Sequence, residues 1–160
     1  MNYDAFIPFT VERIDDATNA PVALVSVTKE AVKNMVLSDA NLRQQIEHVS
    51  AEIAYWGNVV AEAQRTWEWY ERQYRIWRDQ IVDVMLTNTG EKGWKAPTGK
   101  AIEAKYRIHK QYPAYYAAIE RAELAHGRAK AIYDGFKAQA RILDVAVRRS
   151  YDNSAPVLGV

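Results

Sequence analysis

The chain has 160 residues, of which 49% are hydrophobic and 26% are charged, as in one folded unit with an ordinary core. It contains no cysteine, which excludes disulfides and cysteine-ligated metal sites. No segment is long and apolar enough to span a membrane, and the first residues do not resemble a secretion signal. We therefore expect a cytoplasmic protein with no membrane partner.

Residues 1–38 are the least regular part of the chain. Segments 3–11 and 21–27 are rich in residues that favour strands, but neither alternates clearly between polar and apolar positions. We predict an N-terminal arm with little structure of its own, ordered by packing on a neighbour.

The next segment carries a heptad repeat, with apolar residues spaced alternately by four and three positions. These positions are Leu42, Ile46, Val49, Ile53, Trp56, Val60, Ala63, Trp67, Tyr70, Tyr74, Trp77, Ile81 and Val84. No proline interrupts the repeat, so it predicts one helix roughly 65 Å long at about 1.5 Å per residue.

The aromatic residues of this repeat are too bulky for a narrow two-stranded coiled coil. Neutral residues flank them, whereas a two-stranded zipper normally has charged flanks that select its partner. Both features favour a bundle in which each helix contacts several neighbours, and core packing is a better explanation than ligand stacking. The predicted oligomer contacts are Trp56, Trp67, Tyr70, Tyr74 and Trp77.

A basic segment follows the first long helix. Although the net charge is only +1, the chain is acidic up to residue 85 and basic from 86 to 112. Gly90, Gly93 and Pro97 predict a loop, and Thr98 is suited to cap a short helix reaching about residue 111. Cations interleaved with aromatic rings are typical of single-stranded nucleic-acid binding, while a solubilising hairpin tip is the simpler alternative. The candidate binding residues are Lys92, Trp94, Lys95, Lys100, Lys105, Tyr106, Arg107 and Lys110.

A second heptad repeat begins after Pro113 and extends to about residue 150. Its positions are Tyr115, Ile119, Ala122, His126, Ala129, Tyr133, Phe136, Ala140, Leu143 and Val147. Its many alanines complement the bulky aromatics of the first repeat. We therefore predict an all-α fold over 39–150: a long helical hairpin, joined by the basic loop and short helix, that assembles into an oligomeric bundle. Residues 151–160 are predicted to form a mobile tail.

No catalytic or metal-binding pattern is evident. The sequence has no Gly-rich phosphate loop and no nucleophile elbow, and His48, His109 and His126 are scattered without a metal-binding spacing. We expect no enzymatic activity, no cofactor and no metal site.

Several short motifs occur in order along roughly residues 40–150. They are Tyr55-Trp56, Pro97-Thr98, the Lys-Ala-Ile-Glu-Ala run at 100–104, Tyr112-Pro113, Phe136-Lys137 and Arg141-Ile142-Leu143. Together they resemble the UvsY-type recombination mediators of bacteriophages. The resemblance implies a ring-like homo-oligomer in the host cytoplasm that binds single-stranded DNA. It also implies help in loading a RecA-like recombinase against a competing single-strand-binding protein. The implied DNA contacts are Lys92, Trp94, Lys95, Lys100, Lys105 and Arg107.

Two other functions fit the same sequence. One is a coiled-coil scaffold or assembly protein that binds no nucleic acid. The other is a helical adaptor that binds a partner helix along Tyr55 and Trp69.

Overall fold

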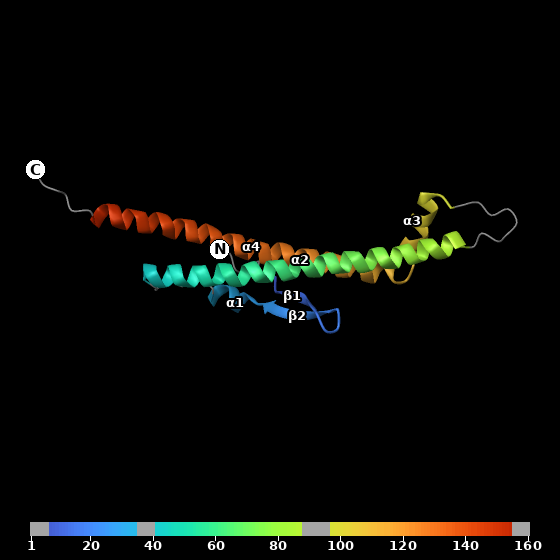
Figure 1. The fold of residues 1–160 in the computed structure, drawn as a ribbon, viewed down its shortest axis with the longest axis horizontal. Coiled ribbons are helices and arrows are strands. Elements are labelled where there is room, and N and C mark those ends of the chain that lie inside the picture. The colour runs from blue at the N-terminus through green and yellow to red at the C-terminus, as the bar shows by residue number, and fades with distance from the viewer. Residues whose placement is uncertain (1–6, 35–40, 88–96, 155–160) are drawn as a thin grey trace, which may run out of the picture.

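The computed structural model of the protein describes residues 7–34, 41–87 and 97–154. Two long helices dominate it, and a small β-hairpin and two short helices accompany them (Figure 1). The elements are β1 (Phe9–Asp15), β2 (Ala20–Val27), α1 (Lys29–Asn34), α2 (Leu42–Thr87), α3 (Gly99–Arg107) and α4 (Tyr112–Ser154).

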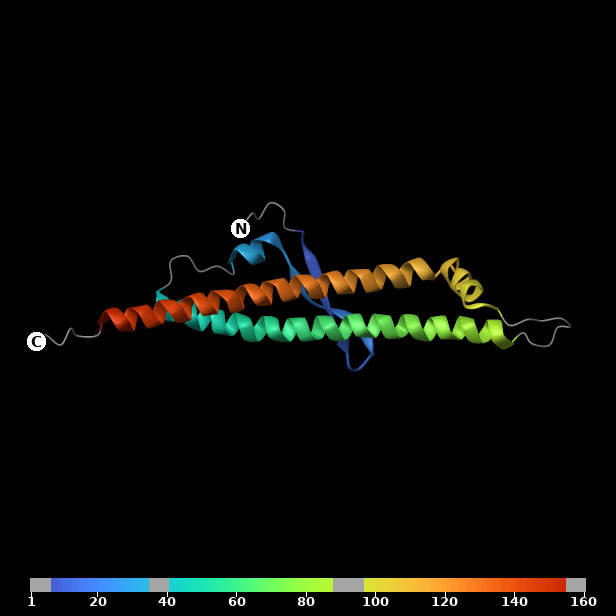
Figure 2. The same cartoon turned by 90° about the horizontal axis from the view of Figure 1, so that it is seen from above.

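The two heptad repeats form the two long helices, which pack side by side in antiparallel orientation (Figures 1 and 2). The predicted helical hairpin is therefore confirmed. A reciprocal capping box begins α2: the Asn41 side chain accepts from the Gln44 amide at 3.0 Å, and the Gln44 side chain accepts from the Asn41 amide at 3.2 Å. Helix α4 continues to Ser154, past the predicted end at 150.

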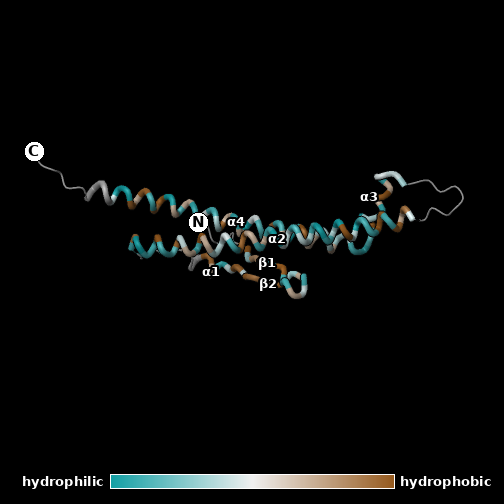
Figure 3. Tube along the Cα trace, in the orientation of Figure 1, coloured by the Kyte–Doolittle hydropathy of each residue, from teal (hydrophilic) through white to brown (hydrophobic). Residues whose placement is uncertain are grey.

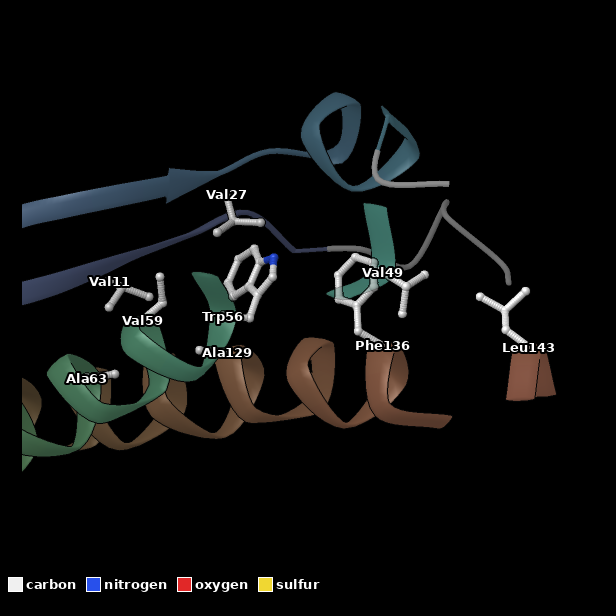
Figure 4. Close-up of a cluster of buried hydrophobic side chains, with 9 residues drawn as sticks. All are labelled: Val11, Val27, Val49, Trp56, Val59, Ala63, Ala129, Phe136 and Leu143. Carbon is white, nitrogen blue, oxygen red and sulfur yellow. The ribbon is translucent and has the colours of Figure 1, made fainter. Parts of the chain in front are cut away.

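Large residues of α2 face small residues of α4 along the contact. Trp56 is 1% exposed and Ala129 is 0% exposed, and Figure 4 shows the Trp56 ring above the turn of α4 that carries Ala129. The same cluster contains Val49, Phe136 and Leu143, all at heptad positions. Polar and apolar residues alternate along both helices (Figure 3), and no helix among the described residues is apolar over a length that could cross a membrane.

The β-hairpin corrects the prediction of an all-α fold. Strands β1 and β2 pair antiparallel, and the register shifts between Val11 and Glu12 so that Leu24 has no partner. In the turn, the Asp15 carboxylate accepts from the Thr18 amide and hydroxyl at 3.1 and 2.7 Å. Asn19 then adopts a φ of 50°, a left-handed conformation that asparagine tolerates. Part of the predicted N-terminal arm is therefore regular structure.

The hairpin lies across the middle of the helical pair (Figure 2), where β1 contacts both α2 and α4. Val11 and Ile14 are buried. Thr66 of α2 is 2% exposed, and its hydroxyl donates to the Glu12 carbonyl at 2.9 Å. Val59 is also buried on this side, so residues flanking the heptad positions of α2 form a second packing face.

Two of the five predicted oligomer contacts are already buried within one chain. Trp56 and Trp77 are 1% and 6% exposed, so neither requires a second copy to remove it from water. Trp67, Tyr70 and Tyr74 are half-buried and retain accessible surface. Assembly through these aromatics stays a prediction.

Candidate nucleic-acid interface

The described part of the basic segment consists of α3 and the turn that leads into α4. Thr98 caps α3 as predicted, since its hydroxyl accepts from the Ala101 amide at 3.3 Å. Pro113 follows as the second residue of α4, where its missing N–H costs no helical hydrogen bond. Lys92, Trp94 and Lys95 lie outside the described residues.

The lysines of this segment point into solvent. Lys100, Lys105 and Lys110 are exposed and form no ion pair within the part of the chain that the structure describes. Arg107 is exposed but pairs with Glu103 one turn earlier. Among the cations of α3 and the following turn, these three lysines are therefore the most readily available to an anionic ligand.

The aromatic component of the site is a series of three tyrosines that we call the tyrosine ladder: Tyr106, Tyr112 and Tyr116. The ring of Tyr106 lies 6.3 Å from that of Tyr112 at an angle of 37°. The rings of Tyr112 and Tyr116 are stacked, with centroids 6.0 Å apart and an angle of 24°. Tyr116 is 55% exposed, so its ring has surface available for a further stacking partner.

The ladder rests on a buried aromatic base centred on Trp77. The Trp77 ring lies 5.0 Å from Tyr115 and 5.4 Å from His109, and its indole N–H donates to the Gln111 side chain at 2.9 Å. These contacts come from α2, from the turn after α3 and from α4. They fix the position of Tyr112, which begins α4 immediately after Gln111.

Beside the ladder lies a groove of about 280 Å³ between α2 and α4. Its lining residues are Glu71, Tyr74, Arg75, Arg78, Tyr112, Tyr116 and Ile119. Burial raises the pKa of Tyr74, and the neighbouring Tyr106 and Tyr112 add to this effect, whereas Arg78 and Arg107 oppose it. Two guanidinium groups therefore lie close to the tyrosines.

Acidic neighbours reduce the positive charge of the groove. Arg75 pairs with Glu71 at 3.1 Å, and Arg78 pairs with Asp79 at 2.9 Å. Such exposed pairs contribute at most about 1 kcal/mol each, so a phosphate can compete for the guanidinium groups. The groove thus offers aromatic surface with weakly held cations.

The described binding residues that the sequence predicted lie together on α3 and the turn after it. Tyr106 joins the tyrosine ladder, and the four cations are Lys100, Lys105, Arg107 and Lys110. Tyr112, Tyr116, Arg75 and Arg78 were not part of the predicted site. The signal for Tyr116 was its position: it follows the heptad residue Tyr115 and therefore lies outside the helix–helix contact.

Other chemistry receives no support from the described residues. They contain no group of three histidine, aspartate or glutamate side chains placed to hold a metal ion. The chemistry that the arrangement itself offers is stacking on the exposed tyrosine and charge contacts to an anion. Comparisons of the chain with models of protein families, with curated proteins and with solved structures gave no match.

Proposed function

We propose that this protein binds single-stranded DNA at the end of the rod that carries the tyrosine ladder and the lysines of α3 and the following turn. The observation that carries the proposal is the stacked pair Tyr112–Tyr116, with Tyr116 more than half exposed, which Tyr106 joins to the segment that carries the exposed lysines. Aromatic faces accept any base, and cations neutralise phosphates with release of counterions. A binding role of this kind requires neither a catalytic group nor a cofactor.

The mediator role is the finer part of the proposal, and it comes from the resemblance to the UvsY-type proteins. In that role an oligomer would hold the strand and present it to a RecA-like recombinase in competition with a single-strand-binding protein. The recombinase step is tested by adding the protein to DNA coated with single-strand-binding protein and measuring recombinase filament formation.

DNA binding is tested by titrating the protein with a fluorescent thymidine oligonucleotide at several salt concentrations. Tyr116→Ala should weaken binding about 5- to 150-fold, which corresponds to the roughly 1–3 kcal/mol of one base stack, and should leave the salt dependence nearly unchanged. Tyr55→Ala is the matched control, because Tyr55 is a similarly exposed tyrosine but lies on α2, outside the ladder.

The lysines should act differently from the tyrosine. Replacing Lys100, Lys105 and Lys110 together with glutamine should flatten the dependence of log affinity on log salt by up to about 2, at roughly 0.7 per phosphate contact. Lys130, Lys137 and Arg141 are exposed cations farther along α4, and their triple glutamine variant is the control.

Two results would contradict the proposal. If the triple glutamine variant of Lys100, Lys105 and Lys110 binds as tightly as the parent with the same salt dependence, this end of the rod is not the site. If the parent binds no DNA at low salt, the scaffold or assembly function replaces it, since that alternative requires the helical rod but no nucleic acid.

A further inference from the structure

The β-hairpin has two edges, and the helices cover only one of them. Strand β1 lies against α2 and α4, and its Glu12 carbonyl accepts the hydrogen bond from Thr66. Strand β2 contacts mainly β1 and lies on the side away from α2 (Figure 1). Within the described residues, its backbone forms no hydrogen bond beyond the β1–β2 ladder.

An open edge of this length is a template for another strand. On either side of the bulge at Leu24, alternate N–H and C=O groups of β2 point away from β1 and remain available for pairing. Edge strands are protected from such pairing by charged side chains, prolines or bulges. Strand β2 has a bulge at Leu24, but its eight residues, Ala-Pro-Val-Ala-Leu-Val-Ser-Val, carry no charge. Proline occurs only at the second position, Pro21, so residues 22–27 keep their N–H groups.

The side chains at this edge are apolar and accessible. Val22 is 38% exposed and Leu24 is 39% exposed, although both belong to a strand whose Val27 is almost fully buried. Adding a strand would remove part of this surface from water at the same time as it satisfied the backbone groups.

We propose that β2 pairs antiparallel with β2 of a second copy about a two-fold axis, which forms a continuous four-stranded sheet. The edge itself favours this occupant, because an uncharged, apolar strand is matched by a strand of the same character, and β2 of a second copy is one. The acidic turn sets the direction. It carries Asp15 and Asp16, although Asp16 also pairs with Arg65 of its own chain at 2.8 Å. Parallel pairing would bring the two acidic turns together, whereas antiparallel pairing places them at opposite ends of the interface.

This interface is self-complementary, as a two-fold dimer requires. It also differs from the heptad aromatics, of which Trp56 and Trp77 are already buried within one chain. The inference does not depend on nucleic-acid binding, because β2 contributes no residue to the tyrosine ladder or its groove.

The first test is the mass of the full-length protein in solution, measured by light scattering coupled to size exclusion. The parent should form a dimer or a multiple of one. Leu24→Lys should halve that mass, because the two new charges would lie close together near the axis. Ile142→Lys is the control: Ile142 is 68% exposed on α4, so its replacement should leave the mass unchanged. A parent of single-chain mass, or a Leu24→Lys protein of parental mass, would overturn the proposal.

A second test remains informative even if Leu24→Lys does not fold. Since the chain has no cysteine, one introduced thiol can cross-link only to its copy. Ala23→Cys lies at the exposed middle of β2 and should form a covalent dimer under mild oxidation, which requires Cα atoms within about 7 Å. Ala131 is exposed on α4, so the Ala131→Cys protein should form no covalent dimer. Equal cross-linking of the two variants would overturn the proposal, as would a monomeric parent whose β2 edge pairs only with an added extended peptide.

Discussion

At the scale of single residues, Trp56 should contribute most to stability. It is the largest side chain that is almost fully buried, and its indole N–H donates to the Glu52 carboxylate at 3.0 Å. Trp56→Ala should lower the free energy of unfolding by about 3–5 kcal/mol. Trp67→Ala should cost less, because Trp67 is half-buried and its indole N–H, although buried, has no hydrogen-bond partner in the described residues. Urea denaturation followed by circular dichroism compares the two, and a larger loss for Trp67→Ala would contradict this order.

Tyr70 should make stability depend on pH in the alkaline range. Burial raises the pKa of Tyr70 above its ordinary value of 10.0, and the hydrogen bond that its hydroxyl donates to the Glu12 carboxylate at 2.9 Å acts in the same direction. The folded state therefore keeps this proton at a pH where the unfolded chain has lost it. The resulting stability is fully present below pH 10 and is lost as the pH rises through the folded pKa.

Tyr70→Phe tests this dependence, because phenylalanine has no proton to lose. The free energy of unfolding, measured from pH 8 to 11, should fall less steeply above pH 10 in Tyr70→Phe than in the parent. Tyr55→Phe is the control, since Tyr55 is exposed and lies on another part of α2. Equal slopes for the parent and Tyr70→Phe would show that folding does not raise the pKa of Tyr70.

At the scale of elements, Thr66, Tyr70 and Arg65 of α2 each bond to the hairpin, and the Thr66 hydroxyl is the one that binds its backbone. Thr66→Val preserves the shape of the side chain but leaves the Glu12 carbonyl without its donor. We expect a loss of about 1–3 kcal/mol, the usual cost of an unsatisfied buried polar group. Hydrogen exchange should then speed up in β1 and β2 more than in α2. Thr98→Ala, which removes an exposed cap on α3, is a control that should leave exchange in the hairpin unchanged.

The long helices could be predicted from sequence because each depends on a local and repetitive pattern. The heptad from Leu42 to Val84 matches α2 closely, and the alanines of the second repeat do face the bulky residues of the first. The hairpin could not be predicted in the same way. In β1, Val11 and Ile14 are buried and the Glu12 carboxylate bonds to Tyr70, so this strand does not alternate between polar and apolar faces. In β2, the extra residue Leu24 interrupts the alternation.

The sequence was enough to locate the cations of the candidate site, but not to show how its aromatic rings come together. The cations of α3 are adjacent in sequence, so composition alone located them. The ladder instead joins Tyr106 of α3 to Tyr112 and Tyr116 of α4, and the nearby arginines come from α2. Only the fold-back of the two long helices brings these segments together, and no local pattern encodes that contact.

At the scale of the whole molecule, length separates this architecture from a compact domain. Helix α2 has 46 residues, which corresponds to about 69 Å at 1.5 Å per residue. A compact domain of this size would have a radius of gyration of about 15 Å, and the unfolded chain one of about 42 Å. A rod as long as α2 has a radius of gyration of about 20 Å even before α3, the hairpin and the overhanging end of α4 are added.

Small-angle scattering should therefore give a radius of gyration above about 20 Å for a single chain and well below the value measured in concentrated urea. Leu24→Lys is the protein to use, because the rod dimension must be measured without the contribution of a second copy. Ile142→Lys, measured in parallel, should give a larger value if the two copies join through β2, since the partner's mass then lies beside the middle of the rod. A value near 15 Å for Leu24→Lys would mean that α2 and α4 break and fold back on themselves. The ladder and the hairpin, which both depend on uninterrupted contact between α2 and α4, would then not form as described here.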